Sequence, residues 1–314
     1  MLFGDHLILL RGGGDLATGV AYRLHKAGFP LIVLELPEPL VVRRRVALAT
    51  AVREGQITVE DLRAIRVNTP DEALQLALAG VIPVLVAPEL TADGRPPTVA
   101  GETTADGRPP TPAGEMTTAG MGASASSLAA VGRRPSAVID ARMAKRNLDT
   151  TRDMAPLVIA LGPGFTAGAD CHAVIETNRG HRLGRVIWHG PAEANTGTPG
   201  IVSGKGAERV LRAPAAGVVQ WRKEIGDRVG QGEVLGQVEG QPVIAPFDGV
   251  ARGLIAPGTA VPAGLKIGDV DPRGDVATCF TISEKALAIG GGVLEAMLTW
   301  LNEQAAQEKS GYAK

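Results

Sequence analysis

Aromatic residues and cysteines are scarce in this chain of 314 residues. Phe, Trp and Tyr make up 3% of it, so a buried core has to be built from Val, Leu, Ile and Ala. Two cysteines, Cys171 and Cys279, are too few for a disulfide framework. The formal net charge of −1 gives no electrostatic basis for binding nucleic acid or an anionic membrane. The composition therefore indicates a globular protein with an aliphatic core and small-molecule or protein partners.

Long apolar runs are missing as well. None approaches the roughly 20 residues needed to cross a bilayer. The first run, Leu7–Leu10, is short and follows a stretch without a basic region, which is unlike a signal peptide. We therefore expect a cytoplasmic protein without a membrane span. Cys171 and the histidines near it match no zinc spacing, so we expect no metal site.

The sequence alternates short apolar runs with amphipathic segments. A strand at Leu7–Leu10, a helix at Asp15–Ala27 that Gly28 ends, and a strand at Leu31–Leu36 form one βαβ unit. The same pattern continues with expected strands at Ala64–Val67, Ile82–Ala87, Ala137–Asp140 and Leu157–Leu161 and a helix at Asp71–Ala79. It predicts a Rossmann-like α/β domain over residues 1–207, an open parallel sheet with helices on both faces.

One stretch of this domain breaks the pattern. "TADGRPPTVAGET" (91–103) is followed at once by its near copy "TADGRPPTPAGEM" (104–116), and then by small and polar residues. Such segments bury too little apolar surface to offset the entropy of ordering them. We expect residues 91–134 to form a mobile low-complexity insertion.

A second repeat, with a period of 32 residues, begins near residue 208. Ala213-Pro214 recurs as Ala245-Pro246, Gly217-Val218 as Gly249-Val250, and four further Gly or Val positions recur at the same offset. The two copies predict a small β domain at 208–275, which resembles the biotinyl/lipoyl-like barrel-sandwich hybrid. The hairpin Glu239–Pro242 between the copies has no lysine, so a swinging-arm carrier is not expected.

The last segment, 276–314, carries an amphipathic helix with an apolar stripe that includes Val293, Met297 and Leu301. We expect this stripe to pack on the α/β domain, and a contact in a homo-oligomer is the alternative. The triple glycine Gly290–Gly292 resembles a flexible entry into that helix. A second anion site at the start of the helix is the other interpretation.

The first glycine loop, "RGGGDLATG", carries the strongest chemical signal. Gly12, Gly14 and Ala17 fit G-x-G-x-x-[GA] between a strand and a helix, where free helix N–H groups favour a phosphate. Glu35 follows Gly14 by 21 residues, at a strand end where an acid contacts a ribose. Asp15 either repels an anion or caps the helix, and a purely structural turn is the alternative. The expected cofactor-binding residues of this loop are Gly12, Gly13, Gly14, Asp15, Ala17, Thr18 and Glu35.

Two further strand ends point to the same crevice, because ligands of open α/β sheets lie beyond the carboxyl ends of the strands. "DARMAKRN" offers Arg142, Lys145 and Arg146 as phosphate partners, with a solvated charged face as the alternative. "GPGFTAGAD" offers Gly162, Gly164 and Thr166 in a second glycine loop, or a tight turn set by Pro163. No G-x-S-x-G elbow supports a hydrolase.

Several long stretches resemble one bacterial family: "RGGGDLATGVAYRLHKAGFPLIVLELPEPLVVRR", "DARMAKRN", "LGPGFTAGADCHAVIETNRGHRLG" and "NTGTPG". It is the YqeB-type accessory protein of selenium-dependent molybdenum hydroxylases, and the duplicated insertion departs from it. The resemblance implies a maturation factor whose partners are a molybdenum hydroxylase or its maturation proteins. XdhC-type maturation factors offer an analogy, since they also pair an accessory role with a Rossmann-like domain. The resemblance supplies no catalytic residue.

The function expected from sequence is therefore an accessory factor that binds a nucleotide or phosphate-bearing cofactor, the dinucleotide form of the molybdenum cofactor among the candidates. An NAD(P)-dependent oxidoreductase is an alternative, although the only tyrosines, Tyr22 and Tyr312, form no Tyr-x-x-x-Lys pair. A non-catalytic scaffold whose β domain docks the hydroxylase is the third. Whether the protein is an enzyme stays open at this point.

Overall fold

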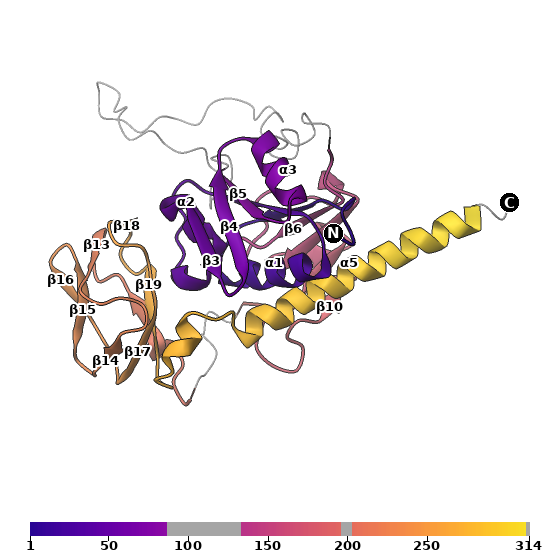
Figure 1. The fold of residues 1–314 in the computed structure, drawn as a ribbon. Coiled ribbons are helices and arrows are strands. Elements are labelled where there is room, and N and C mark those ends of the chain that lie inside the picture. Colours follow the sequence, from indigo (N-terminus) through magenta and orange to yellow (C-terminus); the bar gives the residue numbers. More distant parts are fainter. Residues whose placement is uncertain (87–132, 196–202, 312–314) are drawn as a thin grey trace, which may run out of the picture.

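The computed structural model describes residues 1–86, 133–195 and 203–311. A large sheet forms the centre of the molecule, with a smaller β unit beside it and a long C-terminal helix along one face (Figure 1). The insertion expected at 91–134 lies outside the described residues except for its last two. Within these ranges, no helix is both long and apolar enough to cross a membrane.

The large sheet has nine strands in the order β10-β9-β7-β6-β1-β2-β5-β4-β3. Only its two edge pairs, β3 with β4 and β9 with β10, are antiparallel. The expected α/β fold with a mostly parallel sheet is confirmed. The strands are β1 (Ile8–Arg11), β2 (Leu31–Glu35), β3 (Gln56–Val59), β4 (Leu62–Val67), β5 (Ile82–Val86), β6 (Ala137–Asp140), β7 (Leu157–Leu161), β9 (Ala173–Ile175) and β10 (Val186–Ile187).

The sheet is buried on both faces, which explains why its central strands read as unbroken apolar runs. Every residue of β1, β2, β6 and β7 is buried. Helices α1 and α5 cover one face and α3 packs on the other. The helices are α1 (Asp15–Ala27), α2 (Ala51–Glu54), α3 (Pro70–Leu78) and α5 (Glu284–Gly311), with 3-10 turns η1 (Arg44–Val46), η2 (Leu48–Thr50), η4 (Arg152–Met154), η5 (Ala207–Arg209) and η6 (Val276–Cys279).

Helix α5 lies against α1 at a very short distance, and glycines make that possible (Figure 1). A Cβ placed on Gly290 would lie 2.3 Å from the carbonyl oxygen of Gly19 in α1. A Cβ on Gly292 would lie 2.1 Å from the carbonyl oxygen of Gly184. The expectation that Gly290–Gly292 precede the helix or form its start is wrong, because α5 already begins at Glu284. Gly290 and Gly292 lie inside the helix and let it approach the backbone at Gly19 and at Gly184.

The β unit, defined here as Val210–Asp271, consists of two four-stranded antiparallel sheets, β12-β19-β17-β14 and β16-β15-β13-β18. The 32-residue repeat is visible as equivalent strands that exchange partners: β13 of the first copy pairs with β18 of the second, and β14 with β17. The strands are β12 (Val210–Arg212), β13 (Gly217–Trp221), β14 (Arg228–Val229), β15 (Val234–Val238), β16 (Gln241–Ile244), β17 (Gly249–Leu254), β18 (Ala260–Val261) and β19 (Lys266–Asp271). A further pair, β8 (Thr166–Ala167) with β11 (Gly190–Pro191), lies outside both units.

The segment after β2 joins the β unit to the large sheet. Arg44, which is buried, donates to the carbonyl oxygen of Leu254 at 3.2 Å and forms an ion pair with Glu224 at 2.7 Å. Val42 packs so closely on Gly253 that a Cβ there would lie 2.9 Å from its side chain. This segment also forms one wall of the cavity described next, so the cavity and the contact between the two units share residues.

Candidate functional site

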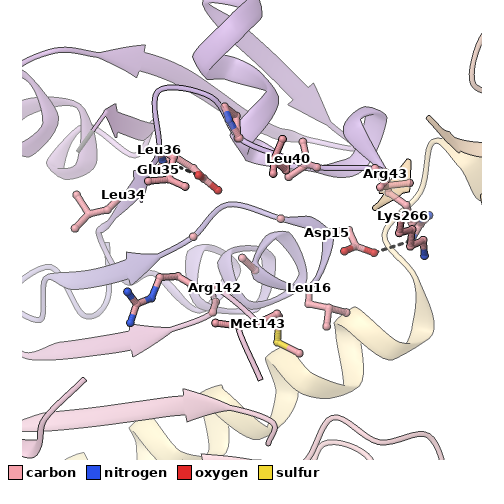
Figure 2. Close-up of a pocket in the computed structure, with 18 of the residues that line it drawn as sticks. Asp15, Leu16, Leu34, Glu35, Leu36, Leu40, Arg43, Arg142, Met143 and Lys266 are labelled. Carbon is pink, nitrogen blue, oxygen red and sulfur yellow. Dashed lines mark hydrogen bonds and ion pairs between the residues drawn. The ribbon is translucent and has the colours of Figure 1, made fainter. Parts of the chain in front are cut away.

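A cavity of about 670 Å³ opens at the carboxyl ends of β1, β2 and β6 (Figure 2). Its volume lies within the roughly 300–1,000 Å³ that small-molecule sites occupy. The position follows from topology: the chain runs from β1 to β2 on one side and later returns to β6 on the other, and the crevice forms where the strand order reverses. Residues of the loops after β1, β2 and β6 line it, together with Arg252 and Lys266 of the β unit.

The three glycines after β1 have different tasks. A Cβ on Gly12 would lie 3.1 Å from the backbone of Arg142, and its φ of +93° favours glycine. A Cβ on Gly13 would lie 2.9 Å from the backbone nitrogen of Ala49. Gly14 has no atom within 4 Å of its Cβ position, and it lines the cavity. Gly12 and Gly13 thus allow close packing of three loops, and Gly14 alone keeps open space for a ligand.

Helix α1 begins without a side-chain cap, because Gly14 occupies its N-cap position. The first helical hydrogen bond runs from the Thr18 N–H to the Gly14 carbonyl. Among the described residues, the backbone N–H groups of Gly14, Asp15, Leu16 and Ala17 meet no acceptor. Four unpaired donors and the positive end of the helix dipole therefore open into the cavity, which favours an anion there.

Asp15 is the first residue of α1 and does not cap it. Its carboxylate forms an ion pair with Arg43 at 3.3 Å (Figure 2). Thr18, also expected in the site, is buried; its hydroxyl donates to the Gly14 carbonyl and accepts from the Leu48 N–H. Thr18 therefore fixes the loop and does not line the cavity.

Glu35 lies in the cavity wall at the end of β2 but is occupied by the loop itself. One carboxylate oxygen accepts from the Gly13 N–H at 2.7 Å and the other from the Leu36 N–H at 2.8 Å. Burial raises the pKa of Glu35, and the two backbone hydrogen bonds oppose that rise. Glu35 therefore holds the glycine loop in place through Gly13. One acceptor site on each of its oxygens is already used, and the expected contact with a ribose stays a prediction.

Of the three cations expected after β6, Arg142 and Arg146 line the cavity and Lys145 does not. Arg142 lines the cavity, but its guanidinium forms ion pairs with Asp140 and Asp149, both at 2.6 Å. Burial acts to lower the pKa of Arg142, and the Asp140 hydrogen bond and both carboxylate charges outweigh it, so the pKa is raised. Arg146 is exposed and lines the cavity, whereas Lys145 is exposed and does not.

The second glycine loop lies elsewhere. Gly162, Gly164 and Thr166 do not line the cavity, and the elements that come next along the chain are the short strands β8 and β9, which do not present free N–H groups as a helix start does. A Cβ on Gly164 would lie 2.5 Å from Cα of Arg146, so this loop supports the Arg146 loop from behind. The Thr166 N–H donates to Asp170 at 2.7 Å. The tight-turn interpretation fits this arrangement.

Three cations at the α1 end of the cavity were not expected from sequence: Arg43, Arg252 and Lys266. The Arg43 side chain is 10% exposed and donates to the Thr278 carbonyl at 3.0 Å, but its buried Nε has no acceptor. Burial lowers the pKa of Arg43, and Asp15 opposes that effect. The arginine run 43–45 is visible in the sequence. No local pattern predicts that Arg43 lies near Arg252 and Lys266, which follow it by more than 200 positions.

Lys266 is the least satisfied of these cations. No described residue forms a hydrogen bond or ion pair with its side-chain ammonium. Lys266 retains exposed surface, but partial desolvation of its ammonium lowers the pKa of this side chain. The charge of Asp269 opposes this shift, and the charge of Arg252 adds to it. A lysine at this position favours an incoming negative charge.

The described residues include potential metal ligands and thiols, and both cysteines are buried. No three His, Cys, Asp or Glu side chains gather there as metal ligands. Cys171 is fully buried, and burial, with the charge of Asp170 second, raises the pKa of its thiol to about 12. Such a thiol is not a nucleophile at neutral pH.

Comparison with known proteins gives a relative that aligns with nearly all of the sequence present here. No family model matches the chain. The Escherichia coli (strain K12) protein named "Uncharacterized protein YqeB" is 44% identical over 300 residues, which cover 96% of this chain and 49% of that protein, so the chain spans about half the length of its relative. A succinylglutamate desuccinylase/aspartoacylase structure from Rhodobacter sphaeroides aligns over 27% of this chain and 29% of its own, with 20% identity and a TM-score of 0.20, too low for an argument about fold. The chain is thus similar to YqeB over nearly all of the sequence present here.

Proposed function

We propose that the cavity binds a nucleotide or another phosphate-bearing cofactor with its phosphate at the start of α1. One observation carries the proposal: four unpaired backbone N–H groups and an uncapped helix dipole open into a cavity of about 670 Å³. The unpaired Nε of the buried Arg43 supports it independently, because a buried donor without an acceptor is costly. Aliphatic side chains, among them Leu36, Leu40 and Leu148, offer the rest of the cavity wall to an apolar part of the ligand.

The hydrogen bonds of Glu35 favour a ligand held mainly through its phosphate. In dinucleotide-binding proteins the acid at the end of the second strand binds the ribose hydroxyls. Here each carboxylate oxygen of Glu35 already accepts one backbone N–H, which leaves fewer acceptor sites for a ribose. A ligand held mainly through phosphate does not depend on Glu35.

The biological role that we propose is maturation of selenium-dependent molybdenum hydroxylases. Support comes from the motifs shared with YqeB-type accessory proteins and from the similarity to YqeB. The ligand would then be a cofactor in transit, such as the dinucleotide form of the molybdenum cofactor. The partners would be a molybdenum hydroxylase or its maturation proteins.

Substitution at Gly14 tests the ligand site without damage to the fold. Gly14 has an extended backbone that any residue adopts and open space around its Cβ position. Gly14→Asp puts a carboxylate over the unpaired N–H groups; it caps α1, adds a few tenths of a kcal/mol of stability and occupies the anion position. We expect calorimetric titration with nucleotides and pyrophosphate to show at least a tenfold loss of affinity.

Gly14→Asn is the matched control, because asparagine caps the helix equally well without the charge. It should be as stable as Gly14→Asp and bind the anion more tightly. Equal binding by wild type and Gly14→Asp would contradict the site. In cells that make a selenium-dependent molybdenum hydroxylase, Gly14→Asp should lower hydroxylase activity at an unchanged amount of hydroxylase polypeptide. Full activity with Gly14→Asp would contradict the maturation role and favour the scaffold alternative.

A further inference from the structure

The β unit contributes two of the cations at the α1 end of the cavity. Arg252 belongs to β17 and Lys266 to β19, which are paired neighbours in one sheet. Figure 2 shows Lys266 beside Arg43 and Asp15, at the side of the cavity where α1 begins. The uncapped N-terminus of α1, a helix that packs on the large sheet, therefore lies near basic residues of the β unit.

These cations differ in how far they are neutralised. Arg252 donates to Asp269 at 2.7 Å and lies 3.5 Å from Asp271. Arg43 has Asp15 as its carboxylate partner, but its nine-tenths-buried side chain keeps an Nε without an acceptor. Lys266 has no ion pair with any described residue. Two of the three thus retain donors for an added anion.

We propose that Lys266 and Arg43, together with the start of α1, form a subsite for a phosphate group, so that the β unit completes the ligand site. The inference rests on the proposed function and deepens it by naming the residues of the phosphate subsite. The ligand places a pyrophosphate or terminal phosphate between the two units. Its remaining part lies along the aliphatic wall.

A consequence follows for the contact between the two units. Val42 and Arg43 belong to the cavity wall and also pack on Gly253 of the β unit. The next residue, Arg44, donates to the Leu254 carbonyl of the same unit. An anion held by Arg43 and Lys266 adds a bridge between the same two surfaces. Ligand binding therefore stabilises the contact between the β unit and the large sheet.

The test measures binding of inorganic pyrophosphate to the whole chain by calorimetric titration. Lys266→Met should weaken binding at least tenfold, and Lys266→Arg should stay within about threefold of wild type. Lys223→Met is the matched control: Lys223 is a lysine of the β unit that pairs with Glu233 and does not line the cavity, so its loss should leave binding unchanged. Because Lys266 makes no ion pair, Lys266→Met should unfold at the same temperature as wild type or higher.

A second measurement addresses the bridge. Pyrophosphate should slow amide hydrogen exchange in residues 41–46 and 251–255 of wild type, and should not do so in Lys266→Met. Wild-type affinity in Lys266→Met, combined with lost affinity in Gly14→Asp, would overturn this inference and leave the proposed function standing. Absence of any nucleotide or pyrophosphate binding by wild type would overturn both.

Discussion

Adjacent glycines in α5 should respond to alanine in opposite directions. Gly290 faces α1, where a Cβ would lie 2.3 Å from the Gly19 carbonyl oxygen, whereas the Cβ position of Gly291 has no atom within 4 Å. Both positions lie in the interior of the same helix. The two substitutions therefore share the effect on helix propensity and differ in packing alone.

The magnitudes follow from these distances. Alanine is better than glycine in a helix interior by about 1 kcal/mol, so Gly291→Ala should raise the free energy of unfolding by about that amount. In Gly290→Ala the new methyl group meets backbone, which cannot rotate away, and α1 and α5 have to separate by about 1 Å to restore an ordinary contact. Overpacking of this kind costs about 1–3 kcal/mol, and the separation also weakens dispersion contacts along both helices.

We expect Gly290→Ala to be less stable than wild type by about 1–2 kcal/mol and less stable than Gly291→Ala by about 2–3 kcal/mol. Urea unfolding followed by far-ultraviolet circular dichroism measures both differences. Gly19→Ala provides a check from the other helix, because its Cβ would lie 2.3 Å from the Ala286 carbonyl oxygen and the loss should be similar. If Gly290→Ala and Gly291→Ala shift stability in the same direction, the close approach of α1 and α5 is not what these glycines provide.

Two further predictions concern titratable groups. Burial acts to raise the pKa of Asp271, but hydrogen bonds with Arg273 and the charges of Arg252 and Arg273 lower it to about 2. Because the folded-state pKa lies below the unfolded value of 3.8, this carboxylate contributes about 2 kcal/mol above pH 4 that is lost as the pH falls towards 2. Asp271→Asn should show a shallower loss of stability over that interval in acid titrations, and an unchanged slope would contradict the assignment. Cys171 and Cys279 are both buried with raised pKa values, so a thiol reagent should label neither at pH 8 in the native protein and both in denaturant; rapid native labelling would refute this.

The glycine triplets show how far local sequence reaches. The first triplet, Gly12–Gly14, follows an apolar strand, and the prediction of a strand, a glycine turn and a helix over Asp15–Ala27 is confirmed. The second, Gly290–Gly292, looks the same locally and has a different role, because α5 begins six residues earlier and packs on Gly19. A partner 271 positions away leaves no mark on the local pattern.

The expected charged residues show the same limit. Arg142 was predicted to bind phosphate from its place after β6, but Asp149, seven positions later, pairs with it. Lys266 carried no signal, because its position in the 32-residue repeat predicts only a strand. It reaches the cavity through the packing of the β unit on the segment after β2.

The sequence by itself determined the alternation of strands and helices, the parallel sheet and the two copies inside the β unit. Those features depend on hydrophobic periodicity and on glycines at turns, which act between near neighbours along the chain. Only the tertiary structure decided which polar groups meet. In it the Gly13 N–H donates to Glu35, Arg142 forms an ion pair with Asp140, and Lys266 lies near the start of α1. Electrostatic partners are set by distance in space, and the distances between loops far apart in sequence are fixed only when the sheet and the β unit pack together.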